Sequence, residues 1–278
     1  MELRERALKA FQADLPKQKA QLALALQSSQ TAMQVDPERQ FVAPDQPGRP
    51  ERPDLVDPKE VPRRSPFTPL GHAALMHSIA HIEFNAINLA LDCIWRYPRM
   101  PEQFYLDWAK VAAEEARHFT LLSGHLEGLG HRYGDFPAHT GLWTVCRNTA
   151  EDIVARMALV PRTMEARGLD ATPLVQAKLK KVGTTAALEA YAILDIILSE
   201  EVGHVAIGNH WYRWLCTRDQ LDADAFYAQA ALQYAAPRPK PPFNYVARKA
   251  AGFTAAELQK LDHDAGLNFP PAHRLQPT

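Results

Sequence analysis

Glu114-Glu115-Ala116-Arg117-His118 is the stretch that decides the fold, and Glu200-Glu201-Val202-Gly203-His204 repeats its pattern, Glu-Glu-x-x-His. A glutamate and a histidine three residues apart on an α-helix are separated by about 60° around the helix axis, so both can reach one metal ion. Such pairs also occur by chance. The segments around the two motifs therefore decide whether they bind metal.

The segment from Gln103 to Gly130 predicts a helix that contains the first motif. Its apolar residues recur every three or four positions, at Phe104, Trp108, Val111, Leu122 and Leu126. Glu115 falls on this apolar stripe. Glu114 instead lies on a charged face that is typical of a solvated helix surface, with Asp107, Lys110 and Arg117. A carboxylate that points into a core costs several kcal/mol unless it is paired, protonated or bound to a cation. Glu115 is therefore a candidate metal ligand, and the alternative is a glutamate satisfied by a protein partner.

A second inward carboxylate is expected on the preceding helix, over residues 70–95. Glu83 lies in the middle of the apolar stripe of that helix. A separate polar stripe contains His77 and His81, which are four residues apart and could also bind a metal. Their face differs from that of Glu83, so we interpret them as structural or supporting residues.

The third and fourth long helices are predicted over residues 148–167 and 184–215. Pro161 should kink the third helix, Gly168 should end it, and a short helix should follow Pro173. Either Glu151 or Glu165 could be its inward carboxylate, and periodicity alone does not choose between them. On the fourth helix Glu200 and Glu201 are both candidates, and Glu201 is preferred because it keeps the i,i+3 spacing to His204.

Four helices that supply Glu, Glu-x-x-His, Glu and Glu-x-x-His in this order present the ligand set of the di-iron and di-manganese carboxylate bundles. Four carboxylates and two imidazoles can hold two divalent ions, and open coordination positions then remain for dioxygen. The sequence therefore predicts an all-α fold and a buried centre for two iron ions, with manganese as the alternative metal.

The same residues resemble an uncharacterised, mostly bacterial family of ferritin-like proteins. Six stretches between Pro47 and Leu261 show the resemblance: 81–83, 115–118, 133–139, 165–170, 201–204 and 242–248. The resemblance implies a ferritin-like four-helix bundle. More distantly, the chain is similar to di-iron hydroxylases that act on a modified adenosine in tRNA, and this similarity favours Glu165 over Glu151. The expected metal ligands are then Glu83, Glu115, His118, Glu165, Glu201 and His204.

Composition limits the other properties of the chain. Lys and Arg number 31 and Asp and Glu number 32, a balance that argues against a broad nucleic-acid-binding surface. The three cysteines are widely spaced and suit a reducing cytoplasm. The N-terminus has no apolar leader and no segment has the length of a membrane span, so we expect a soluble, cytoplasmic protein.

The bundle is expected over residues 70–216, between two attachments. Residues 1–69 should form a helix over about 2–30 and a Pro-rich arm, since nine prolines fall between Pro37 and Pro69. Residues 217–278 should form a helical extension in which Thr254 and Glu257 make a capping box. The N-terminal helix could dock on its own chain or across a homodimer.

These predictions lead to one functional hypothesis and two alternatives. The hypothesis is a di-iron oxidase or monooxygenase that activates dioxygen to oxidise or hydroxylate a small organic molecule, with an electron donor as its second partner. The first alternative is a ferroxidase or peroxide-scavenging ferritin-like protein. The second is a metal-free helical scaffold whose buried carboxylates are satisfied by arginine or by protonation.

Overall fold

The computed structural model describes residues 2–27, 34–42, 44 and 46–266. Within these residues the chain is all-helical, and the predicted all-α class is confirmed. Extended pairing in the described part is limited to one bridge, between Leu55 and Ala138. The helices are α1 (Leu3–Gln12), α2 (Pro16–Gln27), α3 (Pro69–Arg96), α4 (Glu102–Gly128), α5 (Gly141–Asn148), α6 (Ile153–Leu159), the π-helix η1 (Val160–Glu165), α7 (Ala166–Val182), α8 (Thr185–Arg218), α9 (Ala223–Gln233), α10 (Tyr245–Ala250) and α11 (Ala255–Asp264).

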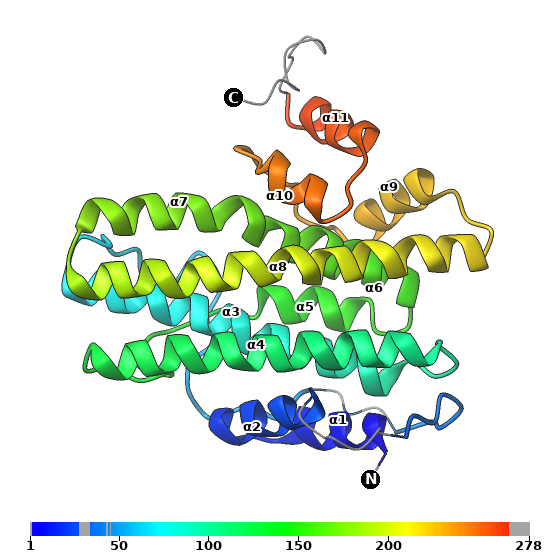
Figure 1. Ribbon diagram of the computed structural model, residues 1–278, viewed down its shortest axis with the longest axis horizontal. Coiled ribbons are helices and arrows are strands. Elements are labelled where there is room, and N and C mark those ends of the chain that lie inside the picture. Colours follow the sequence, from blue (N-terminus) through cyan, green and yellow to red (C-terminus); the bar gives the residue numbers. More distant parts are fainter. Residues whose placement is uncertain (1, 28–33, 43, 45, 267–278) are drawn as a thin grey trace.

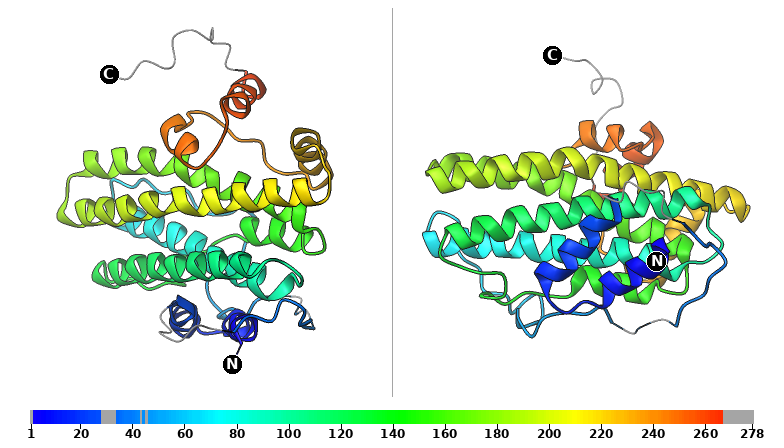
Figure 2. Two further views of the ribbon diagram at one scale, coloured as in Figure 1. Left: turned by 45° about the vertical axis from the view of Figure 1, so that its right-hand side comes forward. Right: turned by 60° about the horizontal axis from the view of Figure 1, so that its bottom comes forward.

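The long helices lie side by side in layers (Figure 1). Helix α3 packs along α4, α4 contacts α8, and α8 also contacts α6, η1 and α7. Helices α1 and α2 cover α3 and α4 from one side, while α10 packs on α7 and α8 at the other (Figure 2). One continuous apolar core reaches from α1 to α9. The helices that carry the two Glu-Glu-x-x-His motifs, α4 and α8, are therefore neighbours in the interior.

Local sequence sets the ends of these helices. The Thr68 hydroxyl accepts a hydrogen bond from the Gly71 backbone N–H at the start of α3, and the Thr184 hydroxyl does the same for Ala187 in α8. Gly183 ends α7 in the left-handed conformation, with φ of 69°. The predicted capping box of Thr254 and Glu257 is confirmed at α11.

The third predicted helix differs from the expectation. Residues 149–152 interrupt it, and Asp152 caps a new start at α6. At Pro161 the helix widens into the π-turn η1 and then continues as α7 to Val182. The predictions that Gly168 ends the helix and that a separate helix follows Pro173 were wrong, because both residues lie inside α7. Packing of α7 along α8 outweighs the weak helix propensity of these two residues.

The N-terminal segment docks on its own chain as two helices, since residues 13–15 interrupt the single helix that was expected. Arg4 is fully buried and donates hydrogen bonds to the carbonyl groups of Ile94 and Trp95 at the end of α3, at 3.1 and 3.0 Å. Its guanidinium also binds the carbonyl oxygens of Asp36 and Arg39 in the arm. These contacts satisfy backbone acceptors that the end of α3 leaves unpaired.

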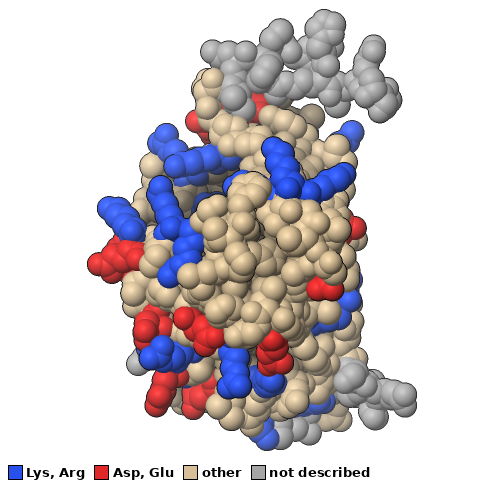
Figure 3. Space-filling view, turned by 90° about the vertical axis from the view of Figure 1, so that its left-hand side faces the viewer, with Lys and Arg blue, Asp and Glu red and all other residues tan. Residues whose placement is uncertain are grey.

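The surface carries charges of both signs. Figure 3 shows one end of the molecule, where lysine and arginine cover the upper part of the face and alternate with acidic residues lower down. Lys178, Lys180 and Lys181 are exposed on α7, as expected for a solvated helix face. The three cysteines are free and buried. None of the helices in the described part of the chain is long and apolar enough to span a membrane.

Candidate metal centre

Helices α3, α4 and α8 bring four predicted ligands together in the interior. Each residue of the set Glu83, Glu115, His118 and Glu201 has a ligand atom within 4.8 Å of one in every other member, and all four side chains are buried. The three helices have apolar stripes that meet in the core, and these residues lie on those stripes. The cluster has the residue types and the proximity to hold a metal ion.

Glu115 lies between the two histidines of the motifs. Its Oε2 is 3.5 Å from Nδ1 of His118, and its Oε1 is 2.9 Å from Nδ1 of His204. Glu83 Oε2 lies 3.2 Å from His118 Nδ1, and Glu201 Oε1 lies 3.6 Å from His204 Nδ1. Each imidazole therefore turns its Nδ1 atom toward two carboxylates, and Glu115 is shared by both.

Several of these buried atoms have no hydrogen-bond partner. They are both carboxylate oxygens of Glu115, both oxygens of Glu165, and Nδ1 of His204. The 2.9 Å approach of His204 to Glu115 thus lacks hydrogen-bond geometry. A buried polar atom without a partner costs about 1–3 kcal/mol, and more when it is charged. His118 Nδ1 and Glu83 Oε2 are hydrogen-bonded to each other, but Glu115 and His204 approach without such a bond. Atoms brought together in this way fit the ligands of a common cation.

The second nitrogen of each histidine binds a glutamate from the other motif. His118 Nε2 lies 2.8 Å from Glu200 Oε2, and His204 Nε2 lies 2.9 Å from Glu114 Oε2. A carboxylate on the outer nitrogen fixes the imidazole tautomer so that the inner nitrogen can bind metal. The interpretation of Glu114 as a solvated surface residue was wrong, because its side chain reaches across to α8.

Because Glu200 contacts the outer nitrogen of His118, it lies outside the cluster of Glu83, Glu115, His118 and Glu201. Arg117 forms an ion pair with Glu200, and Lys110 lies 3.9 Å from Glu114. The pairing role of these two glutamates was not predicted from the sequence. A signal for it was present, since both motifs have a glutamate directly before the inward one.

Glu165, on η1, lies outside the set of four converging residues and interacts with it electrostatically. Its side chain is buried, whereas Glu151, the alternative on this segment, is exposed before the start of α6. The π-turn brings Pro161 against Gly208 of α8, where a Cβ atom added to the glycine would lie 2.5 Å from Pro161 Cβ. This close approach places the Glu165 carboxylate in the electrostatic field of Glu201 and Glu115.

Burial and mutual repulsion shift the protonation of the cluster. Burial, and next the neighbouring Glu115, raise the pKa of Glu83 well above its ordinary value, and burial with Glu201 does the same for Glu165. Burial would lower the pKa of His118, but Glu115 and Glu83 outweigh it and raise the value to about 10. In the absence of metal, protons therefore offset the carboxylate charges. Divalent ions would displace these protons on binding.

His77 and His81 lie apart from this cluster. His77 accepts a hydrogen bond from the Gly134 backbone N–H at 2.9 Å, and His81 lies 2.8 Å from the Tyr133 hydroxyl. Both contacts involve the loop after α4, in agreement with the structural role that was expected for them.

Sequence comparison gives the family of the chain. The family model described as "Protein of unknown function (DUF455)" matches residues 12–259. The chain belongs to the DUF455 family. The matched range contains all six predicted ligands as well as Glu114 and Glu200.

A relative is found in Haemophilus influenzae (strain ATCC 51907 / DSM 11121 / KW20 / Rd), described as "Uncharacterized protein". It is 51% identical over 216 residues, which cover 75% of this DUF455 chain and 74% of the relative. No solved structure matches the chain significantly. Neither description gives an activity, so the function has to be argued from the site.

Proposed function

We propose that the chain is a ferritin-like di-metal carboxylate protein that activates dioxygen to oxidise a small organic molecule. The six metal ligands in this proposal are Glu83, Glu115, His118, Glu165, Glu201 and His204. Iron is the expected metal and manganese the alternative. In the fold that goes with this proposal, α3, α4, the run from α6 to α7, and α8 form the bundle, while residues 1–69 and 217–278 are its attachments.

The observation that supports the proposal most directly is the crossed pairing of the two motifs. Glu114 of α4 binds His204 of α8, and Glu200 of α8 binds His118 of α4. In each pair, the glutamate of one motif contacts the histidine of the other motif. A buried glutamate that is simply satisfied by a protein partner does not require two matched pairings. Two equivalent metal positions account for them, because a carboxylate on Nε2 orients each histidine so that its Nδ1 can bind a metal.

The charges of the site also fit two divalent ions. Four carboxylates carry four negative charges, which two divalent cations neutralise, so that the buried cluster has no net charge when both histidines are neutral. The metal-free scaffold, the second of the two alternatives, would leave the Glu165 oxygens without a hydrogen-bond partner inside the protein. No arginine forms an ion pair with the six ligands within the described residues, so protonation is the way left for this alternative to satisfy the carboxylates.

The residues of the chain would perform two tasks around the metals. When bound, iron supplies the binding and reduction of dioxygen, with electrons from an external donor. Glu114 and Glu200 hold the imidazoles in orientation, and their contacts with Lys110 and Arg117 link them to the surface. The apolar walls of α3, α4 and α8 exclude water and protect reactive species from side reactions.

A comparison of two glutamate variants on α4 tests the proposal. Glu115→Gln keeps the size of the side chain but removes the charge shared by the two histidines, whereas Glu102→Gln changes an exposed glutamate of the same helix. Anaerobic protein loaded with ferrous iron is mixed with dioxygen in the presence of a reductant. We expect rapid oxygen uptake by the wild type and by Glu102→Gln. With Glu115→Gln, oxygen uptake should be no faster than with ferrous iron in the absence of protein. Equal uptake by both variants would reject the proposed function.

A further inference from the structure

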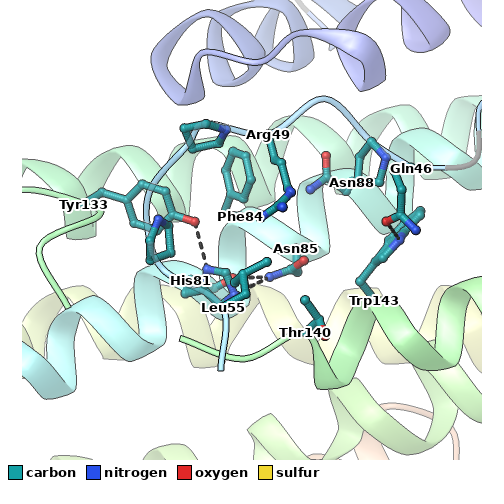
Figure 4. A pocket seen from close by; sticks show the side chains of 13 residues that line it. Gln46, Arg49, Leu55, His81, Phe84, Asn85, Asn88, Tyr133, Thr140 and Trp143 are labelled. Atoms are coloured by element: carbon teal, nitrogen blue, oxygen red, sulfur yellow. Dashed lines mark hydrogen bonds between the residues drawn. The ribbon is translucent and has the colours of Figure 1, made fainter. Parts of the chain in front are cut away.

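A cavity of about 280 Å³ lies between the Pro-rich arm and α3, apart from the metal centre (Figure 4). The arm contributes prolines and Arg49, α3 contributes polar side chains, and Tyr133, Thr140 and Trp143 complete the wall. On α3 the lining residues are centred about 150° around the helix axis from Glu83, at about 100° per residue. A molecule in this cavity would contact the face of α3 that points away from the cluster of carboxylates.

The arm is fixed at both ends of the cavity. At one end the Gly48 backbone N–H donates to the Phe11 carbonyl at 2.9 Å, and a Cβ atom at Gly48 would lie 2.2 Å from the carbonyl oxygen of Gln12. At the other end Val56 N–H donates to the Ala138 carbonyl, and Ala138 N–H donates to the Asp54 carbonyl. The arm is thus held on the helical body in a way that leaves the space beneath it open. A preformed cavity of this kind lowers the entropic cost of binding a ligand.

The polar part of the lining carries one positive charge, that of Arg49, and no negative charge. None of its thirteen residues is acidic. Figure 4 shows Arg49 extending from the arm toward the α3 side chains. Within the described part of the chain Arg49 forms no ion pair with a carboxylate. An unpaired guanidinium over a cavity without acidic groups favours an anion, and a carboxylate matches its two parallel donors.

A buried lysine orients a second donor toward the same space. Lys19 of α2 is fully buried, and its ammonium donates to the Asn88 Oδ1 atom and to the Phe11 carbonyl, both at 2.6 Å. Because the Asn88 oxygen accepts this hydrogen bond, the Asn88 amide nitrogen is left for another acceptor. Asn88 is 1% exposed and lines the cavity, so a ligand is the acceptor that its position allows.

The rest of the wall is apolar and includes two aromatic rings. It consists of the rings of Phe84 and Trp143, the side chain of Leu55 and the three prolines Pro47, Pro50 and Pro53. The Trp143 indole N–H is already used, since it donates to Gln46 Oε1 at 3.0 Å. We infer that this cavity binds a small carboxylic acid with a flat apolar body, whose carboxylate meets Arg49 and the Asn88 amide. The inference does not rest on the proposed function, because the site shares no residue with the metal centre.

Binding of benzoate tests this inference, with benzamide and benzylammonium as neutral and cationic probes of similar size. The indole N–H resonance of Trp143, assigned with Trp143→Phe, reports on the cavity in two-dimensional NMR spectra. We expect benzoate to shift this resonance saturably at millimolar concentration, and the other two probes to leave it in place. The absence of a saturable shift with benzoate, or a preference for benzylammonium, would overturn the inference.

Two variants and one control assign the effect to the proposed residues. Arg49→Gln removes the cation, and Asn88→Asp keeps an acceptor for Lys19 but replaces the amide donor by a carboxylate. Each should weaken benzoate binding at least about tenfold, since hydrogen bonds to charged groups contribute about 1.5–3 kcal/mol. Arg63→Gln, an exposed position on the same arm, should bind as the wild type does. Unchanged affinity in folded Arg49→Gln would contradict the assignment.

Discussion

Glu114 and Glu200 show how much the role of a single side chain can depend on the position of a neighbouring helix. On a helical projection of its own segment, Glu114 shares a face with charged residues and points to solvent. In the structure that face lies beside α8, and the side chain ends 2.9 Å from His204. Glu115 was recognised from the sequence because a carboxylate on an apolar stripe is unusual in any packing. The role of Glu114 could not be recognised, because it depends on the position of α8 beside α4.

The crossed pairing makes a prediction for Glu200→Gln. This variant keeps the size of the side chain but weakens the carboxylate contact that orients His118. We expect two metal ions per chain at saturation and an affinity lowered about 10–100-fold, which is the usual effect of losing such a supporting residue. Competition with a coloured chelator measures the affinity. Glu189→Gln, at an exposed position on the same helix, is the control, and an equal affinity in both variants would contradict the supporting role.

His77 gives the protein a dependence on pH that is separate from the metal centre. Burial lowers the pKa of His77 to about 4, below its ordinary value of about 6.5. The unfolded chain then binds more protons than the folded chain between these two values. The free energy of unfolding should therefore fall by up to about 3 kcal/mol as the pH falls from 6.5 to 4.

Urea unfolding at several pH values tests this expectation with His77→Gln, whose side-chain oxygen can still accept from the Gly134 N–H. We expect the variant to lose the part of the slope that His77 contributes, while His81, whose pKa burial also lowers to about 4, keeps contributing in this window. His263→Gln, at an exposed position on α11, should keep the wild-type slope. The same slope in all three proteins would show that His77 is not the group responsible.

At the scale of helices, periodicity identified the three long ones with inward carboxylates. The α3, α4 and α8 helices are long, and their apolar stripes repeat over many turns, so single residues do not obscure the pattern. The segment from α6 to α7 is different. Its π-turn and its continuation through Gly168 and Pro173 depend on contacts with α8. The low helix propensity of Gly168 and Pro173 predicts instead that the helix is interrupted there.

The contact between η1 and α8 makes a prediction for two glycines of α8. In Gly208→Ala the new methyl group would meet Pro161 at 2.5 Å, so η1 must shift. We expect a loss of about 1–3 kcal/mol in the free energy of unfolding, as is usual for an overpacked core. Gly203→Ala has no atom within 4 Å and should stabilise the helix by up to about 1 kcal/mol. Urea unfolding of both metal-free variants measures the difference, and equal stabilities would contradict the close packing.

At the scale of the whole molecule, the two attachments cover different faces of the long helices. Helices α1 and α2, with the buried Arg4 and Lys19, cover one side, while α9, α10 and α11 lie on the other side (Figure 2). Composition predicted the Pro-rich arm, because prolines exclude regular helix. The cavity beneath the arm could not be predicted, because it depends on where Gly48 and Ala138 meet the rest of the chain.

The most direct test of the di-metal centre is the number of metal ions that the protein binds. Purified protein is titrated anaerobically with ferrous iron, and the bound iron is counted after removal of the excess. We predict two irons per chain in the wild type, and fewer than two in Glu115→Gln with unchanged helix content. Parallel titration with manganese compares the two metals. No stoichiometric binding of either metal would contradict the account, and the carboxylates would then have to be held by protons alone.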